Sequence, residues 1–151
     1  MHSVLRRGRG AFLTETPGPG WKPDADVVWI DLFRPTREEE LAVEAALGVD
    51  LPTREEMAAL EPSSRLYQEG GATFMTATLL ARSHEDKPFG TPVTFVLVKG
   101  LLVTLRYEEL RAFTVFSGRA LEEEKASGAE ALLGLLDAVV ERLAQVLDDT
   151  G

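Results

Sequence analysis

The repeated sequence Thr-Arg-Glu-Glu is the feature that most constrains how this chain can fold. It occupies residues 36–39 and again 53–56, and a proline precedes each copy. In such a motif the threonine side chain accepts a hydrogen bond from the backbone N–H three residues later. The glutamate at that later position accepts in return from the threonine N–H. This reciprocal capping box predicts that two helices begin in close succession, each with acidic residues in its first turn.

A strand is expected just before the first of these helices. Residues 26–33 (DVVWIDLF) are apolar enough for the centre of a sheet. The helix that follows spans 36–47 and ends at Gly48, since glycine readily takes the left-handed conformation that closes a helix. The second helix is predicted at 53–60, before Pro62. The order is therefore strand, helix, helix.

A periodicity of two residues then indicates strands. They are predicted at 65–69, 72–82, 92–98 and 101–107, and the last two form a hairpin that turns at Lys99-Gly100. Helices are predicted at 108–121, with Phe113 and Phe116 on the buried side, and at 127–147.

The last helix has the strongest helical periodicity in the chain. We expect its buried stripe to consist of large aliphatic residues spaced three or four positions apart, with three more aliphatic residues beside the stripe. The expected stripe is Leu132, Leu136, Val139, Leu143 and Val146, flanked by Leu133, Val140 and Leu147.

These elements predict an α/β (α+β) layered domain with a mixed parallel and antiparallel sheet and a helical C-terminus. Residues 1–25 are expected to contain one short strand, between 4 and 14, followed by a flexible, turn-rich linker at 16–23. The main domain is expected at 26–151.

Composition excludes several classes of function. The 151 residues carry a formal net charge of −9, which argues against nucleic acid and anionic membrane surfaces as partners. There is no cysteine, so disulfides and thiolate chemistry are excluded. No apolar run reaches the roughly 20 residues of a membrane helix.

We find no catalytic constellation in the sequence. The two histidines, His2 and His84, are not in a metal-ligand spacing, and no nucleophile is paired with a base. We therefore predict that the chain is not an enzyme. Acidic residues remain as candidates. Asp137 and Glu141 repel each other four residues apart on one helix, which a cation or a basic partner would relieve, but the composition favours a solvated acidic face.

Four blocks of sequence resemble the cytoplasmic N-terminal domain of the CorA-type divalent-cation transporters, including the ZntB branch. The first is similar to the W-I-D/N-L strand of that family. The second is similar to its segment ending in L-E-D, the third to its β-hairpin, and the fourth to its L-L-D-A helix. The blocks are residues 28–35, 47–57, 93–108 and 132–147.

The resemblance implies an α/β/α fold and a regulatory, metal-sensing role in a homopentameric transporter of the inner (cell) membrane. It implies that the stalk and transmembrane helices of such a transporter are absent from this chain and that it is a fragment of a longer protein. Regulatory metal in the family lies between subunits. The matching ligands here are Glu55, Glu56 and Asp137, with Mg²⁺ as the leading ion and Co²⁺ or Zn²⁺ as alternatives.

Two readings remain open. Glu56 is also the partner of a capping box, so its carboxylate has a purely structural explanation. The chain could also be a stand-alone soluble interaction module that reuses a CorA-like fold, because a fold does not by itself dictate a function.

Overall fold

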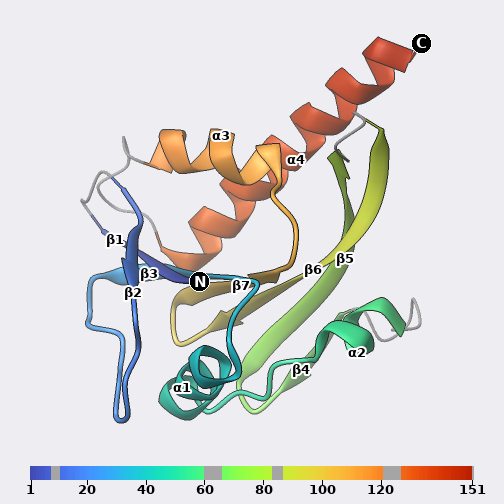
Figure 1. Cartoon of the computed structure of the whole chain (residues 1–151). Coiled ribbons are helices and arrows are strands. Elements are labelled where there is room, and N and C mark those ends of the chain that lie inside the picture. Colours follow the sequence, from blue (N-terminus) through green and yellow to red (C-terminus); the bar gives the residue numbers. More distant parts are fainter. Residues whose placement is uncertain (8–10, 60–65, 83–86, 121–126, 151) are drawn as a thin grey trace.

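The computed structural model describes residues 1–7, 11–59, 66–82, 87–120 and 127–150. Helices cover both faces of a seven-stranded sheet whose strand order is β2-β1-β3-β7-β6-β5-β4 (Figure 1). The elements are β1 (His2–Arg6), β2 (Leu13–Glu15), β3 (Val27–Phe33), α1 (Arg37–Leu47), α2 (Arg54–Ala59), β4 (Leu66–Glu69), β5 (Ala72–Arg82), β6 (Pro88–Val98), β7 (Leu101–Arg106), α3 (Arg111–Ala120) and α4 (Gly128–Thr150).

The sheet is mixed, as predicted. Strands β3 and β7 run parallel in its centre, with Ile30 opposite Val103, while the neighbouring pairs are antiparallel. One core lies under α1 and α2 and contains Ile30 and Leu32 of β3. A second core lies under α3 and α4 and contains Trp29 of the same strand. The sequence of β3 is nearly continuously apolar because helices cover the strand on both faces of the sheet.

The predicted boundaries of α1 are confirmed. Thr36 and Glu39 form the complete capping box, and Gly48 adopts the left-handed conformation with φ of 68°. The turn of the β6–β7 hairpin is also confirmed, since Lys99 and Gly100 both have positive φ, as a tight hairpin turn requires. The predicted ends of two helices, Leu60 and Leu121, lie outside the described residues.

The prediction of one short strand near the N-terminus was wrong. Two strands form there, and β1 lies inside the sheet between β2 and β3. Val4 of β1 is fully buried, but so is the polar His2, and Ser3 is only 6% exposed. Buried polar residues break the alternation of polar and apolar residues that identifies a half-buried strand from sequence.

The predicted buried stripe of α4 was confirmed in part. Leu132 and Val139 pack, partly buried, against the core that contains Trp29. The fully buried residues of the helix are Ala131, Leu135 and Ala138, whereas the predicted Leu143 is 45% exposed and the flanking Leu133 and Val140 are each 64% exposed. Small alanines allow the helix to lie close to the sheet, and this fixes its rotation. The helix then continues past the sheet (Figure 1), and Leu133, Val140 and Leu143 are exposed along it.

His2 is a buried histidine without a hydrogen-bond partner among the described residues. Its side chain is 0% exposed, neither ring nitrogen is paired, and the ring makes an edge contact with Trp21 at 4.7 Å. Burial lowers the pKa of His2, against the opposing attraction of Glu15 and Glu39. The folded state therefore holds this imidazole neutral.

We expect acidification to destabilise the fold through His2. The unfolded chain takes up this proton near pH 6.5, its ordinary pKa, while the folded chain does so only at lower pH. The free energy of unfolding should therefore fall as the pH drops below about 6.5, by at most about 1.4 kcal/mol per pH unit. Urea denaturation of the wild type and His2→Leu between pH 7.5 and 5.5 checks this. Equal pH dependence in both proteins would contradict it.

Candidate functional site

The three predicted metal ligands lie on opposite faces of the sheet. Glu55 and Glu56 are exposed on α2, beside the core that contains Met57. Asp137 is exposed on α4, beside the other core. Within the described part of the chain, no group of three or more histidine or acidic residues is placed to hold a metal ion. One copy of the chain therefore does not bring these carboxylates together.

Glu56 is engaged as the capping box predicts. Its Oε1 accepts from the backbone N–H of Thr53 at 3.2 Å, and its own N–H donates to Thr53 Oγ1 at 3.1 Å. The hydrogen bond from the Thr53 backbone uses only one oxygen of the Glu56 carboxylate. The other oxygen of this exposed side chain can still bind a cation. The structural role of Glu56 is confirmed, and its role as a metal ligand stays a prediction.

The start of α2 is held against the end of β7. The Arg54 guanidinium lies 4.9 Å from the ring centroid of Tyr107 and 3.9 Å from Oε1 of Glu108. Burial raises the pKa of the Tyr107 hydroxyl, and the charges of Glu40 and Glu55 add to this effect. The acidic start of α2 is thereby fixed beside the connection that leaves β7.

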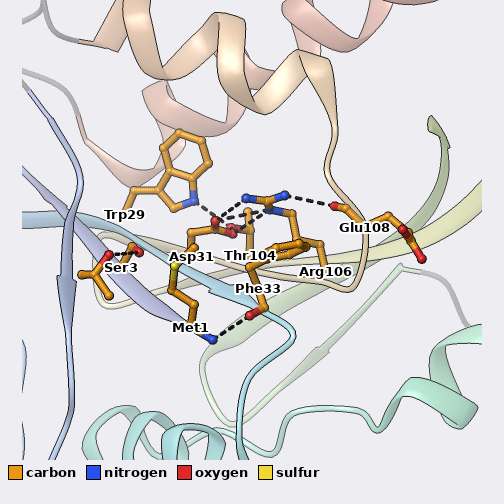
Figure 2. A network of polar contacts seen from close by, with 9 residues as sticks. Met1, Ser3, Trp29, Asp31, Phe33, Thr104, Arg106 and Glu108 are labelled. Carbon is orange, nitrogen blue, oxygen red and sulfur yellow. Dashed lines mark hydrogen bonds and ion pairs between the residues drawn. The ribbon is translucent and has the colours of Figure 1, made fainter. Parts of the chain in front are cut away.

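Sequence reasoning missed a buried polar cluster at the carboxyl ends of β3 and β7 (Figure 2). Asp31 is 7% exposed and lies opposite Thr104 in the parallel pair. The indole N–H of Trp29 donates to Thr104 Oγ1 at 2.9 Å, and the Thr104 hydroxyl donates to Asp31 Oδ1 at 2.8 Å. A charged residue within an otherwise apolar strand was the signal that could have indicated this cluster.

Arg106 completes the cluster with a bidentate ion pair. Its Nη2 is 2.9 Å from Asp31 Oδ2, and its Nε is 3.2 Å from both carboxylate oxygens. The guanidinium lies 4.4 and 4.7 Å from the ring centroids of Phe33 and Phe113. Both oxygens of Asp31 are therefore occupied, so this carboxylate is a clamp between strands and is not available as a cation ligand.

The clamp lies at the edge of the sheet where the connections from two neighbouring strands, β3 and β7, lead to opposite faces. The chain leaves β3 toward α1 on one face and leaves β7 toward α3 on the other (Figure 1). Arg34, with a φ of +45°, reaches across this edge and donates from Nε to the Tyr107 carbonyl at 2.7 Å. Such edges often bind ligands in α/β proteins, but here protein side chains satisfy the polar groups described above.

Comparison with known proteins then gives the family. A profile described as "CorA-like Mg2+ transporter protein" matches residues 24–151. The chain belongs to the CorA-like Mg²⁺ transporter family. The prediction from the resemblance is thus confirmed, and membership of a family of transporters also confirms that this CorA-like chain is not an enzyme.

Curated CorA proteins are similar to the chain over most of its length. The magnesium transport protein CorA of Escherichia coli (strain K12) is 32% identical over 130 residues, which are 85% of this chain and 41% of that protein. The protein of the same name from Salmonella typhimurium (strain LT2) is 32% identical over 126 residues, covering 82% of this chain and 40% of that protein. The chain spans about two fifths of the length of these relatives.

Solved structures show the same fold. The soluble domain of CorA from Methanocaldococcus jannaschii has a TM-score of 0.68 at 13% identity, over 99% of this chain and 61% of that one. The ZntB cytoplasmic domain from Vibrio parahaemolyticus RIMD 2210633 has a TM-score of 0.65 at 13% identity, over 99% and 62%. The predicted α/β fold of the CorA-like chain is confirmed. None of its described helices is both long and apolar enough to cross a membrane.

Proposed function

We propose that this chain is the cytoplasmic, ion-sensing part of a magnesium transporter, in which Mg²⁺ bridges acidic side chains of adjacent copies. Membership of a family of Mg²⁺ transporters supports the transported ion. The observation that carries the proposal is the exposure of Glu56 and Asp137 on opposite faces of the sheet. Each carboxylate is thereby directed away from its own chain and toward a neighbour.

The arrangement of these acidic residues favours a ring. If the α2 face of one copy meets α4 of the next, the two contacting surfaces differ, and repeated contacts of this kind form a closed ring when the rotation between copies closes. The exposed apolar residues Leu133 and Val140 of α4 supply surface that such a contact would bury. Five copies follow from the family resemblance.

The chemistry of the residues favours Mg²⁺ over Zn²⁺. Carboxylates that leave several waters on the ion suit Mg²⁺, which needs one or two protein ligands. Zinc sites normally include histidine or cysteine. The chain has no cysteine, and of its two histidines His2 is buried in the sheet, while His84 lies outside the described residues. Co²⁺ remains an alternative ion for the same carboxylates.

The negative charge of the copies would make the ring sensitive to the cation concentration. Copies with a net charge of −9 repel each other, and bridging cations offset this repulsion and hold the ring closed. When the cation concentration falls, the bridges are lost, and the ring loosens toward the conducting state. This is a two-state change driven by the different affinities of the two states for the ion.

Thermal unfolding in a Mg²⁺ titration tests the proposal. We expect saturable stabilisation, reaching about 2.7 kcal/mol at a concentration of 100 Kd, that Na⁺ at equal ionic strength does not produce. Asp137→Asn and Glu56→Gln should each weaken it, and the glutamine keeps an oxygen for the helix cap. Glu38→Gln, which removes an exposed charge from α1, is the control and should respond like the wild type. Equal responses of all four proteins would refute the assigned ligands.

A further inference from the structure

Three arginines line a pocket that the ion-sensing proposal does not use. Arg82 ends β5, Arg111 begins α3, and Arg142 lies on α4, and together they line a cavity of about 360 Å³. Figure 1 shows the end of β5 beside α4, far along the sheet from the N-terminus. Among the described lining residues, Glu109 is the one carboxylate beside three arginines. The described lining is therefore positively charged, although the whole chain carries a net charge of −9.

The first turn of α3 adds to the positive potential. It contains no acidic residue, and it begins with Arg111. Leu110, which precedes the helix, has no side-chain oxygen with which to cap the first backbone N–H groups. A helix N-terminus carries about half a positive charge, so an arginine there is unfavourable, and a bound anion would relieve the repulsion. Leu110, Arg111 and Thr114 of this segment all line the pocket.

An apolar groove adjoins the pocket. This groove of about 80 Å³ shares Leu80, Leu110 and Arg142 with the pocket, and the rest of its wall consists of Thr78, Leu79, Ala112, Val139 and Leu143. A ligand that fills both parts carries an anionic group at one end and a short apolar group at the other.

We propose that this pocket binds a phosphate monoester, with the phosphate between the guanidiniums of Arg111 and Arg142 and its apolar substituent in the groove. Planar guanidinium groups from several directions suit a phosphate, which accepts paired hydrogen bonds from them. The site is separate from Glu56 and Asp137, so it gives the domain an input that does not depend on the cation bridge.

Calorimetric titration of the chain with inorganic phosphate and with butyl phosphate, at constant ionic strength set by chloride, tests this site. We expect Arg111→Gln and Arg142→Gln each to weaken phosphate binding by about tenfold, since each removes a charged donor. Glu109→Gln should tighten binding, because it removes the carboxylate that repels the anion. Arg37→Gln, at an exposed arginine on α1, is the matched control and should change little.

Two results would overturn the assignment. The first is phosphate binding no stronger than that of chloride, and the second is an equal loss of affinity in Arg37→Gln and Arg111→Gln, which would indicate general charge attraction. Tighter binding of butyl phosphate than of inorganic phosphate supports the part assigned to the groove. Equal binding of the two overturns that part.

Discussion

Replacing Asp31 by alanine is expected to lower the free energy of unfolding by about 3–5 kcal/mol. The substitution leaves the guanidinium of Arg106, whose side chain is 12% exposed, without its carboxylate partner in the interior. The hydroxyl of Thr104 also loses the oxygen to which it donates at 2.8 Å. Equilibrium denaturation in urea measures the loss.

Two further variants distinguish the stability cost of breaking the buried Asp31–Arg106 pair from the cost of breaking an exposed ion pair. Arg37→Ala breaks an ion pair of 3.0 Å at an arginine that is 64% exposed, so it should cost less than about 1 kcal/mol. Replacing Asp31 and Arg106 together by leucine and methionine should recover much of the stability lost in Asp31→Ala, because no unpaired charge remains. A loss in Asp31→Ala no larger than that in Arg37→Ala would contradict the clamp.

Gly128→Ala should destabilise the fold by about 3 kcal/mol, although alanine is the better helix former. A Cβ at this first residue of α4 would lie 2.4 Å from the Leu101 carbonyl carbon and 2.6 Å from the Leu102 nitrogen. Both atoms belong to the backbone of the central strand β7, which cannot move aside. The N–H of Gly128 also donates to the Gly100 carbonyl at 3.0 Å, and that contact would be pushed apart.

Gly18→Ala is the control for this prediction. No atom lies within 4 Å of a Cβ built at Gly18, so alanine there should leave stability unchanged or raise it slightly. Urea denaturation of both variants gives the comparison. Stability of Gly128→Ala equal to or above that of the wild type would show that α4 does not pack closely on the β6–β7 turn.

Local signals were sufficient to predict much of the fold. The capping box at Thr36 and the glycine at position 48 marked both ends of α1, because each satisfies backbone groups within a few residues. The hairpin turn at Lys99-Gly100 was predictable for the same reason. Such features depend on the nearest residues, so the sequence alone specifies them.

Features that depend on distant residues were not predictable. Asp31 meets Arg106 across 75 positions of sequence, and no spacing indicates that pair. The aliphatic residues of α4 surround much of its circumference. Periodicity therefore identified Leu132 and Val139, which are partly buried against the core, but not the closely packed Ala131 and Ala138. The strand β1 was likewise not predictable from its sequence, because the burial of its polar residues His2 and Ser3 depends on the neighbouring strands β2 and β3.

The candidate metal ligands combine a feature that follows from local sequence with one that depends on a second copy of the chain. The cap made by Glu56 follows from residues 53–56, and the structure confirms it. A cation site that joins α2 of one copy to α4 of another depends on a contact between chains. The fold of one chain places these carboxylates on outward faces, and in the proposed site the other ligands would come from the next copy.

Sedimentation equilibrium of the chain with and without Mg²⁺ tests the central proposal most directly. If cations bridge adjacent copies, Mg²⁺ should raise the average mass above that of the monomer, whereas Na⁺ at equal ionic strength should not. Asp137→Asn should remain at the mass it has without Mg²⁺, while Glu38→Gln should associate like the wild type. A mass that does not change with Mg²⁺, or an equal rise in Asp137→Asn, would contradict bridging through these carboxylates.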